Sequence, residues 1–382
     1  MREDELLDWL RARQGEMARL LQDLALAESP SVPASSQRDA VALLVGELGA
    51  AGYLTRQARG FEGGSHLYAR PVERMRGAPR QLVLGHVDTV WPLGSVESMT
   101  PRIEDGRLYG PGVYDMKGGL VQLVYALRAL HDLGLTPTVT PVVLVNSDEE
   151  VGSEDSVRWI RLLARGAARA FVLEPPAGSN GQLKTRRKGV GRFRLTVHGR
   201  AAHAGSRPEE GISAILELAR QVERLFALND PDRGITVNVG TIDGGLRPNV
   251  VAPEATAMVD ARAPTREAAV TVEQAIRDAG PLPPGLTVAL EGGFRRPPMV
   301  ATPGNRALCD RARVLAASLG LDVGEAGLVG GASDANFTSE LSPTLDGLGA
   351  LGGGAHAADE HVVVSALPER AALLALLLLD PA

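Results

Sequence analysis

Short apolar runs alternate with stretches of helical period from residue 81 onward, and this alternation constrains the fold more than any other feature of the chain. The apolar runs lie at Leu82–His86, Thr140–Ser147 and Ala168–Glu174, and helical stretches at 117–133 and 153–165 separate them. A strand that returns to its sheet through a helix runs parallel to the strand before it, and the helices then cover both faces of the sheet. The pattern therefore predicts an α/β fold with a doubly wound, mainly parallel sheet.

The segment 185–297 follows a different pattern. Its predicted elements run strand, helix, strand, strand, helix, strand, at 191–199, 208–228, 235–242, 255–262, 265–279 and 286–291. This order is typical of a ferredoxin-like α+β unit. Because helix–strand alternation resumes at Pro298, we expect residues 1–184 and 298–382 to form one domain, interrupted by an inserted domain at 185–297.

The composition excludes several classes of function. Of the 382 residues 44% are hydrophobic and 23% are charged, which is globular usage. The net charge of −6 provides no attraction for nucleic acid or an anionic membrane, so we expect neither as a partner. The single cysteine, Cys309, excludes an internal disulfide and a cysteine-based zinc site. Any metal ligand or nucleophile therefore comes from His, Asp, Glu or Ser.

Neither end of the sequence has the pattern of a targeting or membrane segment. The first residues, MREDELLDWL, are acidic and lack the apolar core of a secretory signal. The most apolar run, at 371–379, has about half of the ~20 residues that a membrane span needs, so its pattern predicts a helix docked on the core. We expect a cytoplasmic protein.

Acidic and imidazole side chains follow the predicted strands or stand in glycine-rich loops. They are His86, Asp88, Asp115, Glu149, Glu150, Glu174 and His356. In parallel sheets ligands bind beyond the carboxyl ends of the strands, where these segments meet. Each residue alone has an ordinary structural explanation, such as a helix cap or a buried hydrogen bond. Together at one sheet edge they predict a crowded anionic pocket that needs a cation to be stable.

The motifs around these residues resemble those of one known family. GHVDTV, GPGVYDMKGG, the pair Glu149–Glu150, the turn LEP and a late H-x₄-H segment are similar, in order, to the M20 family of zinc-dependent metallopeptidases and deacylases. That family includes glutamate carboxypeptidases, acetylornithine deacetylases and succinyl-diaminopimelate desuccinylases. The resemblance covers nearly the whole chain, and the motif spacing is most similar to the glutamate carboxypeptidase branch.

The resemblance implies two zinc ions per subunit, with Co²⁺ or Mn²⁺ as alternatives. His86 is then a ligand of one ion and His356 of the other, and Asp115 bridges the two. Glu174 completes the shell of the first ion, and Glu150 that of the second. Imidazole nitrogen and carboxylate oxygen are ligands that zinc accepts, and a shared carboxylate reduces the repulsion between two neighbouring cations.

The resemblance also assigns the catalytic roles next to the metals. Glu149 becomes the general base that takes a proton from the attacking water and delivers it to the leaving amine. Asp88 orients the imidazole of His86, as metal-bound histidines usually require.

The inserted domain has its own candidates. By resemblance it is a lid and dimerisation domain, and His203 donates to the tetrahedral oxyanion, often from the partner subunit. Asn249 and Arg262 match positions that contact the substrate carboxylate or backbone. Arg296 matches a carboxylate-binding arginine, with the adjacent Arg295 as an alternative. A guanidinium binds a carboxylate with two parallel hydrogen bonds, which suits recognition of a free carboxyl group.

Two features leave the substrate open. Gln182 stands where glutamate carboxypeptidases carry a lysine, and Lys184 lies two residues further on. The glycine-rich segment 327–336 either presents backbone N–H groups to a substrate carboxylate or is an ordinary turn.

These observations favour a homodimeric, co-catalytic dizinc hydrolase. It would cleave an amide bond beside a free carboxylate in a small N-acyl amino acid or dipeptide, as a glutamate carboxypeptidase does. The alternative is an N-acyl-amino-acid deacylase of the acetylornithine deacetylase or succinyl-diaminopimelate desuccinylase type. A non-enzymatic binding or scaffold protein is a third interpretation, which the complete set of ligands and the glutamate pair disfavour.

Overall fold

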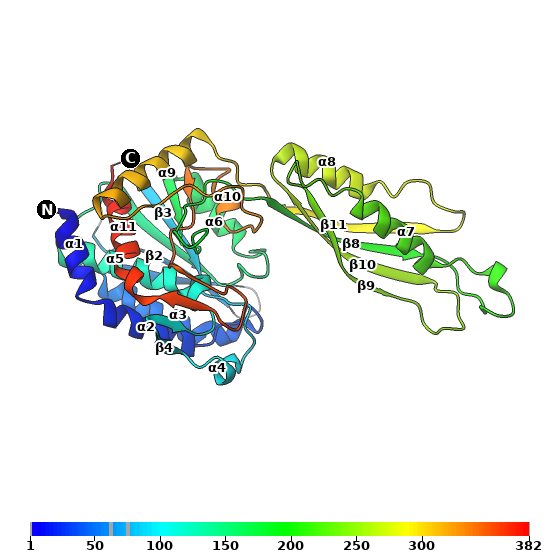
Figure 1. Ribbon diagram of the computed structural model, residues 1–382, viewed down its shortest axis with the longest axis horizontal. Helices are drawn as coiled ribbons and strands as arrows, with labels where there is room; N and C mark the ends of the chain where they lie inside the picture. The colour runs from blue at the N-terminus through cyan, green and yellow to red at the C-terminus, as the bar shows by residue number, and fades with distance from the viewer. Residues whose placement is uncertain (1, 61–63, 74–76, 382) are drawn as a thin grey trace. The chain divides into compact units, whose positions relative to one another are not determined.

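The computed structural model describes residues 2–60, 64–73 and 77–381 (Figure 1). The chain forms two compact units. Unit 1 consists of Met1–Thr185, Ala301–Gly327 and Ser333–Ala382, and unit 2 of Arg186–Val300 and Leu328–Ala332. The glycine-rich segment 327–336 is therefore divided between the units.

The central sheet of unit 1 has the strand order β1-β2-β6-β3-β7-β12. Its strands are β1 (Tyr53–Arg59), β2 (Ser65–Pro71), β3 (Arg80–His86), β6 (Thr140–Asn146), β7 (Ala167–Val172) and β12 (Thr344–Leu345). Strands β6, β3, β7 and β12 run parallel, whereas β1 and β2 add an antiparallel edge. Nearly every residue of β3 and β6 is buried, as expected where both faces of a sheet are covered. The predicted α/β class with a mainly parallel sheet is confirmed.

Helices enclose this sheet around one apolar core. They are α1 (Arg2–Arg11), α2 (Gln14–Leu26), α3 (Arg38–Ala50), α5 (Gly118–Asp132), α6 (Val157–Arg165), α9 (Pro303–Ser318) and α11 (Leu367–Leu379). The apolar run at 371–379 lies in α11, which packs against α5 and is buried from Ala371 to Leu378. No helix in the described ranges is both long and apolar enough to cross a membrane. The cytoplasmic location stays a prediction.

A second, small sheet in unit 1 joins segments that are distant in sequence. Its order is β13-β14-β5-β4, from β4 (Arg102–Glu104), β5 (Arg107–Tyr109), β13 (Gly352–Gly353) and β14 (His361–Val363). The pairing of β14 with β5 holds the loop 354–360 beside the residues that precede α5. Short helical turns lie at Ala34–Gln37, Ser95–Ser98 (α4), Val113–Lys117, Pro208–Glu210, Ala335–Thr338 (α10) and Val364–Ala366.

Unit 2 is an antiparallel sheet with two helices on one face (Figure 1). Its elements are β8 (Gly189–His198), α7 (Ala214–Phe226), β9 (Thr236–Gly244), β10 (Glu254–Ala263), α8 (Arg266–Arg277) and β11 (Thr287–Arg296), in the sheet order β11-β8-β10-β9. Burial alternates along β8 and β10, so every second side chain faces the helices. The chain order is the predicted one. The helix expected from residue 208 begins at Ala214, because the Ser213 side chain accepts the N–H of Leu216 and caps it there.

Candidate metal centre

Three neighbouring parallel strands bring the predicted ligands together. His86 ends β3, Glu149 and Glu150 follow β6, and Glu174 follows β7. Because β6, β3 and β7 are adjacent, their carboxyl ends open at the same edge of the sheet. Asp115 reaches this edge from the turn before α5.

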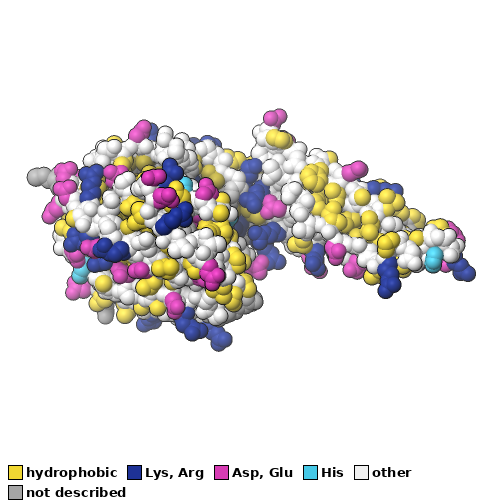
Figure 2. Space-filling view, turned by 60° about the horizontal axis from the view of Figure 1, so that its bottom comes forward, with side chains coloured by type: hydrophobic (Ala, Val, Ile, Leu, Met, Phe, Trp, Pro, Cys, Tyr) yellow, Lys and Arg dark blue, Asp and Glu magenta, His cyan; other side chains and the backbone are white. Residues whose placement is uncertain are grey.

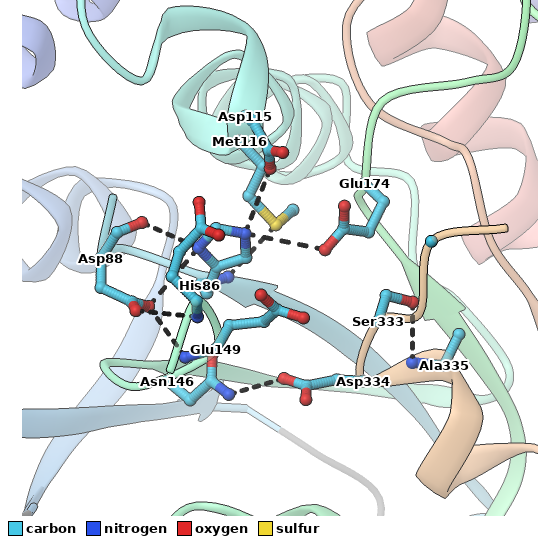
Figure 3. A network of polar contacts seen from close by, with 12 residues as sticks. His86, Asp88, Asp115, Met116, Asn146, Glu149, Glu174, Ser333, Asp334 and Ala335 are labelled. Atoms are coloured by element: carbon cyan, nitrogen blue, oxygen red, sulfur yellow. Dashed lines mark hydrogen bonds and ion pairs between the residues drawn. The ribbon is translucent and has the colours of Figure 1, made fainter. Parts of the chain in front are cut away.

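One group of ligand atoms surrounds His86. Its Nε2 lies 3.3 Å from Asp115 Oδ1 and 3.6 Å from Glu174 Oε1. Figure 3 shows these carboxylates converging on the imidazole, with the Glu149 side chain beside it. His86, Glu149 and Glu174 each offer an atom within 4.8 Å of the others, and all three residues are buried.

A second group lies on the other side of Asp115. His356 Nε2 is 3.5 Å from Asp115 Oδ2 and 3.4 Å from Glu150 Oε1. The two oxygens of Asp115 therefore face two different histidines, which is the arrangement a bridging carboxylate requires. His356 has a positive φ of 60° and a half-exposed side chain. Such backbone strain outside glycine is concentrated at functional sites.

The donor set fits divalent cations. Within the described ranges, His86 Nε2, Asp115 Oδ1 and Glu150 Oε1 are buried atoms without a hydrogen-bond partner. Buried polar atoms that make no hydrogen bond are costly unless an ion binds them. Nitrogen and carboxylate oxygen together suit zinc, cobalt and manganese.

The pKa shifts of the site residues also indicate a need for positive charge at this site. Burial lowers the pKa of His86, but the carboxylates of Asp115 and Asp88 beside its ring outweigh this effect and hold the pKa well above its usual value. Asp115 and Glu150 raise the pKa of His356 to about 10. Burial raises the pKa of Glu150, against the opposing effect of His356. The carboxylates thus favour positive charge on the imidazoles, and a bound metal cation would supply positive charge at the same place.

Asp88 fixes the start of the glutamate pair. Its carboxylate, fully buried, accepts the Ser31 hydroxyl at 2.7 Å and the backbone N–H groups of Glu149 and Glu150 at 3.1 Å each. The Nδ1 atom of His86 lies 2.9 Å from the backbone oxygen of Asp88 and 3.5 Å from its carboxylate. The imidazole thus contacts Asp88 mainly at its main chain, and the Asp88 side chain binds the backbone of the glutamate pair.

The remaining predicted residues lie in unit 2. His203 and Asn249 are neighbours there: His203 pairs with Val250 across a bridge, and Ala204 N–H donates to the Asn249 carbonyl. The Nδ1 atom of His203 accepts N–H groups from Gly205 and Ser206, each at 3.1 Å. This arrangement places the ring proton on Nε2, which is then a donor.

The two predicted arginines flank one residue of β8. Arg262 on β10 and Arg296 on β11 are both in register with Val190, so their side chains leave the same face of the sheet. Arg262 forms a fork with Asp260, at 2.9 and 3.3 Å, and donates to the Gly330 carbonyl at 3.0 Å. Arg296 is buried.

Two supporting features were not expected from the sequence. Asn146 donates to Asp334 at 2.6 Å, which ties the end of β6 to the glycine-rich segment 327–336 (Figure 3). Glu360 accepts hydrogen bonds from the turn that carries Asp115. In the sequence, the position of Glu360 four residues after His356, inside the H-x₄-H segment, could have indicated a role at the site.

Gln182 and Lys184 lie in unit 1, where Gln182 pairs with Ala177 and Lys184 with Asp346 through the backbone.

Comparisons with known proteins identify the family. The pattern of peptidase family M20/M25/M40 matches residues 82–380. Carboxypeptidase G2 of Pseudomonas sp. (strain RS-16) is 30% identical over 311 residues, which cover 80% of this chain and 74% of that protein. Succinyl-diaminopimelate desuccinylase of Xanthomonas oryzae pv. oryzae (strain MAFF 311018) is 32% identical over 357 residues, which cover 87% and 90%.

Solved structures share the fold. Aminopeptidase PepT from Bacillus cereus ATCC 10987 has a TM-score of 0.74 at 22% identity and covers 96% of this chain and 98% of its own. The M20 family metallo-carboxypeptidase Sso-CP2 from Sulfolobus solfataricus has a TM-score of 0.73 at 17% identity, with 96% and 99% covered. The family pattern covers most of the chain, the relatives named above are hydrolases, and side chains that could hold a metal ion cluster at the sheet edge. This protein is therefore a hydrolytic enzyme and belongs to peptidase family M20/M25/M40.

Proposed function

We propose that this protein is a co-catalytic dizinc hydrolase that cleaves an amide bond next to a free carboxylate. The observation that carries the proposal is Asp115, whose two oxygens face His86 and His356 separately. His86, Asp115 and Glu174 would hold one ion, and His356, Asp115 and Glu150 the other. When bound, the ions lower the pKa of a coordinated water and polarise the scissile carbonyl.

The protein's own groups then move the protons and position the substrate. Glu149, which is buried at the sheet edge beside His86, accepts the proton of the attacking water and returns it to the leaving amine. His203 donates from Nε2 to the oxyanion. Arg262 and Arg296, on one face of the unit 2 sheet, recognise the carboxylate of the substrate, and Asn249 contacts its backbone.

Variants of Glu149 test this mechanism. Glu149→Gln keeps the size of the side chain but removes its basicity, so we expect kcat to fall by about 10²–10⁴-fold with an unchanged zinc content of two ions per chain. Glu104→Gln makes the same change at an exposed carboxylate and should leave kcat unaltered. A Glu149→Gln protein with normal kcat would remove Glu149 from the role of base.

Two panels of substrates would distinguish the two candidate substrate classes. Similarity to carboxypeptidase G2 and the paired arginines favour release of a carboxylate-bearing amino acid such as glutamate from an N-acyl compound or dipeptide. Similarity to succinyl-diaminopimelate desuccinylases, together with Gln182 in place of the lysine, favours a second candidate, an N-acyl-amino-acid deacylase. Assay of the zinc-loaded enzyme on N-acyl-glutamates and dipeptides, and in parallel on acetylornithine and succinyl-diaminopimelate, separates the two candidates.

We further propose a homodimer in which His203 serves the site of the partner subunit. Unit 2 carries exposed apolar side chains, among them Ile215, Leu216, Ile242 and Leu246, and Figure 2 shows hydrophobic side chains gathered on the face of unit 2 seen there. Exposed apolar area of this kind marks interfaces. Mixing His203→Ala and Glu149→Ala proteins should restore activity in heterodimers. Mixtures that remain inactive would contradict the exchange.

A further inference from the structure

Glu360 is buried at the point where three metal-site segments meet. Its side chain is only 1% exposed, yet it carries a carboxylate. Such a group is retained in a protein interior only when hydrogen bonds satisfy it. Burial raises the pKa of Glu360, and hydrogen bonds from Asp115, Gly112 and Trp91 oppose that rise.

Each oxygen of this carboxylate accepts two hydrogen bonds. Oε1 accepts the backbone N–H groups of Tyr114 at 2.9 Å and Asp115 at 3.0 Å. Oε2 accepts the indole Nε1–H of Trp91 at 2.7 Å and the N–H of Gly112 at 2.9 Å. The turn before α5 is thus bound at three of its N–H groups, including that of the bridging Asp115.

The same residue anchors the loop of His356. The backbone oxygen of Glu360 accepts the N–H of Gly110 at 3.2 Å, and its own N–H donates to Ala357 at 3.0 Å, next to His356. Trp91 lies in the segment that follows His86 and Asp88. Glu360 therefore connects the segments of His86, Asp115 and His356.

We propose that Glu360 is a positioning residue that holds Asp115 and His356 at the separation needed to bind the second metal ion. This inference rests on the two-metal proposal above. Two of the three ligands of the first ion, His86 and Glu174, are set by the adjacent strands β3 and β7, so that ion depends less on Glu360 than the second ion does. The ion between Asp115, His356 and Glu150 depends on two loops that Glu360 joins.

A carboxylate is required because the four donors approach it in pairs. Glutamine has the same shape but one acceptor oxygen, so in either orientation of its amide one pair of N–H donors faces an NH₂ group. Glu360→Gln therefore disturbs the turn without removing side-chain volume. Loss of support around metal ligands typically costs about 10–100-fold in metal affinity.

The test measures Zn²⁺ affinity by competition with a chromophoric chelator, together with kcat at increasing free Zn²⁺. We expect Glu360→Gln to bind one ion as the wild type does and the other about 10–100-fold more weakly, with kcat recovering at high free Zn²⁺. Glu104→Gln, at an exposed position, should match the wild type in both measurements.

Other outcomes distinguish the two proposals. A Glu360→Gln protein with wild-type affinity for both ions overturns the positioning role, whatever its kcat. A wild-type protein that binds no divalent ion overturns the two-metal proposal and this one with it. If Glu360→Gln does not fold, Trp91→Phe removes one donor and keeps the carboxylate. It should weaken the same single ion by a few-fold, and an unchanged affinity of that variant refutes the inference.

Discussion

Replacement of Asp88 by asparagine tests how the glutamate pair is held. In wild-type protein one oxygen of Asp88 accepts the Glu149 N–H, and the other accepts the Glu150 N–H and the Ser31 hydroxyl. In Asp88→Asn an NH₂ group replaces one of these oxygens. If it faces Glu149, that N–H loses its acceptor, and if it faces Glu150, the second N–H does. The Ser31 hydroxyl can rotate and accept instead.

The best orientation of the asparagine therefore leaves one buried backbone N–H unsatisfied. Such a loss costs about 1–3 kcal/mol. We expect urea unfolding of the metal-free variant to show a free energy of unfolding lower by this amount, with an unchanged dependence on urea concentration. Because the unsupported N–H groups belong to Glu149 and Glu150, kcat of the zinc-loaded variant should also fall by about 10–100-fold.

Two controls define the result. Asp105→Asn makes the same change at an exposed position and should leave both quantities unaltered. Ser31→Ala removes a donor and leaves the two N–H groups paired, so its stability loss should be less than about 1 kcal/mol. An Asp88→Asn protein whose unfolding free energy and kcat both equal those of the wild type would refute this account of Asp88.

Three further predictions address the core, a close approach near Glu174 and the metals. Burial raises the pKa of Cys309 to about 11 from 9.0, which leaves about 100-fold less thiolate at pH 8. A disulfide reagent should therefore label Cys309 far more slowly in native protein than in unfolded protein. Equal labelling rates would contradict the burial of Cys309. A Cβ at Gly349 would collide with the Leu173 carbonyl and lie 2.8 Å from that of Glu174, so Gly349→Ala should lower the free energy of unfolding by about 1–3 kcal/mol. The matched Gly46→Ala, in α3 with nothing within 4 Å, should raise it by about 0.5–1 kcal/mol, and the opposite ranking of the two would disprove the packing argument. Chelation of the metals should lower the thermal midpoint, since ligands at 100 times their Kd contribute about 2.7 kcal/mol; an unchanged midpoint in protein shown to lose zinc would contradict a link between metal binding and stability.

Local patterning in the sequence was sufficient to predict the main parallel strands of unit 1 and the order of elements in unit 2, but not the antiparallel edge formed by β1 and β2. The continuous apolar runs at β3, β6 and β7 are read directly from residue type, because a strand covered on both faces needs apolar side chains throughout. The order of elements in unit 2 follows from alternation along β8 and β10 in the same way. The placement of His86, Glu149 and Glu174 at strand ends came from these runs.

Boundaries set by single hydrogen bonds were not predictable in this way. The helix expected from residue 208 starts at Ala214, since the chain is extended at Gly211 after the turn at Pro208–Glu210 and Ser213 then caps the helix. Whether a serine caps a helix depends on the backbone conformation of the residues before it, and residue type alone does not give that conformation.

The sequence by itself determined which side chains are available for chemistry and on which strand ends and loops they stand. Only the tertiary structure decided that the two oxygens of Asp115 separate His86 from His356, that the carboxylate of Asp88 supports the glutamate backbone, and that Glu360 joins loops far apart in the chain. The physical reason is that residue type and spacing report on local conformation. The partners of a buried polar group are set by segments that meet only after the chain has folded, and each such group must find one there.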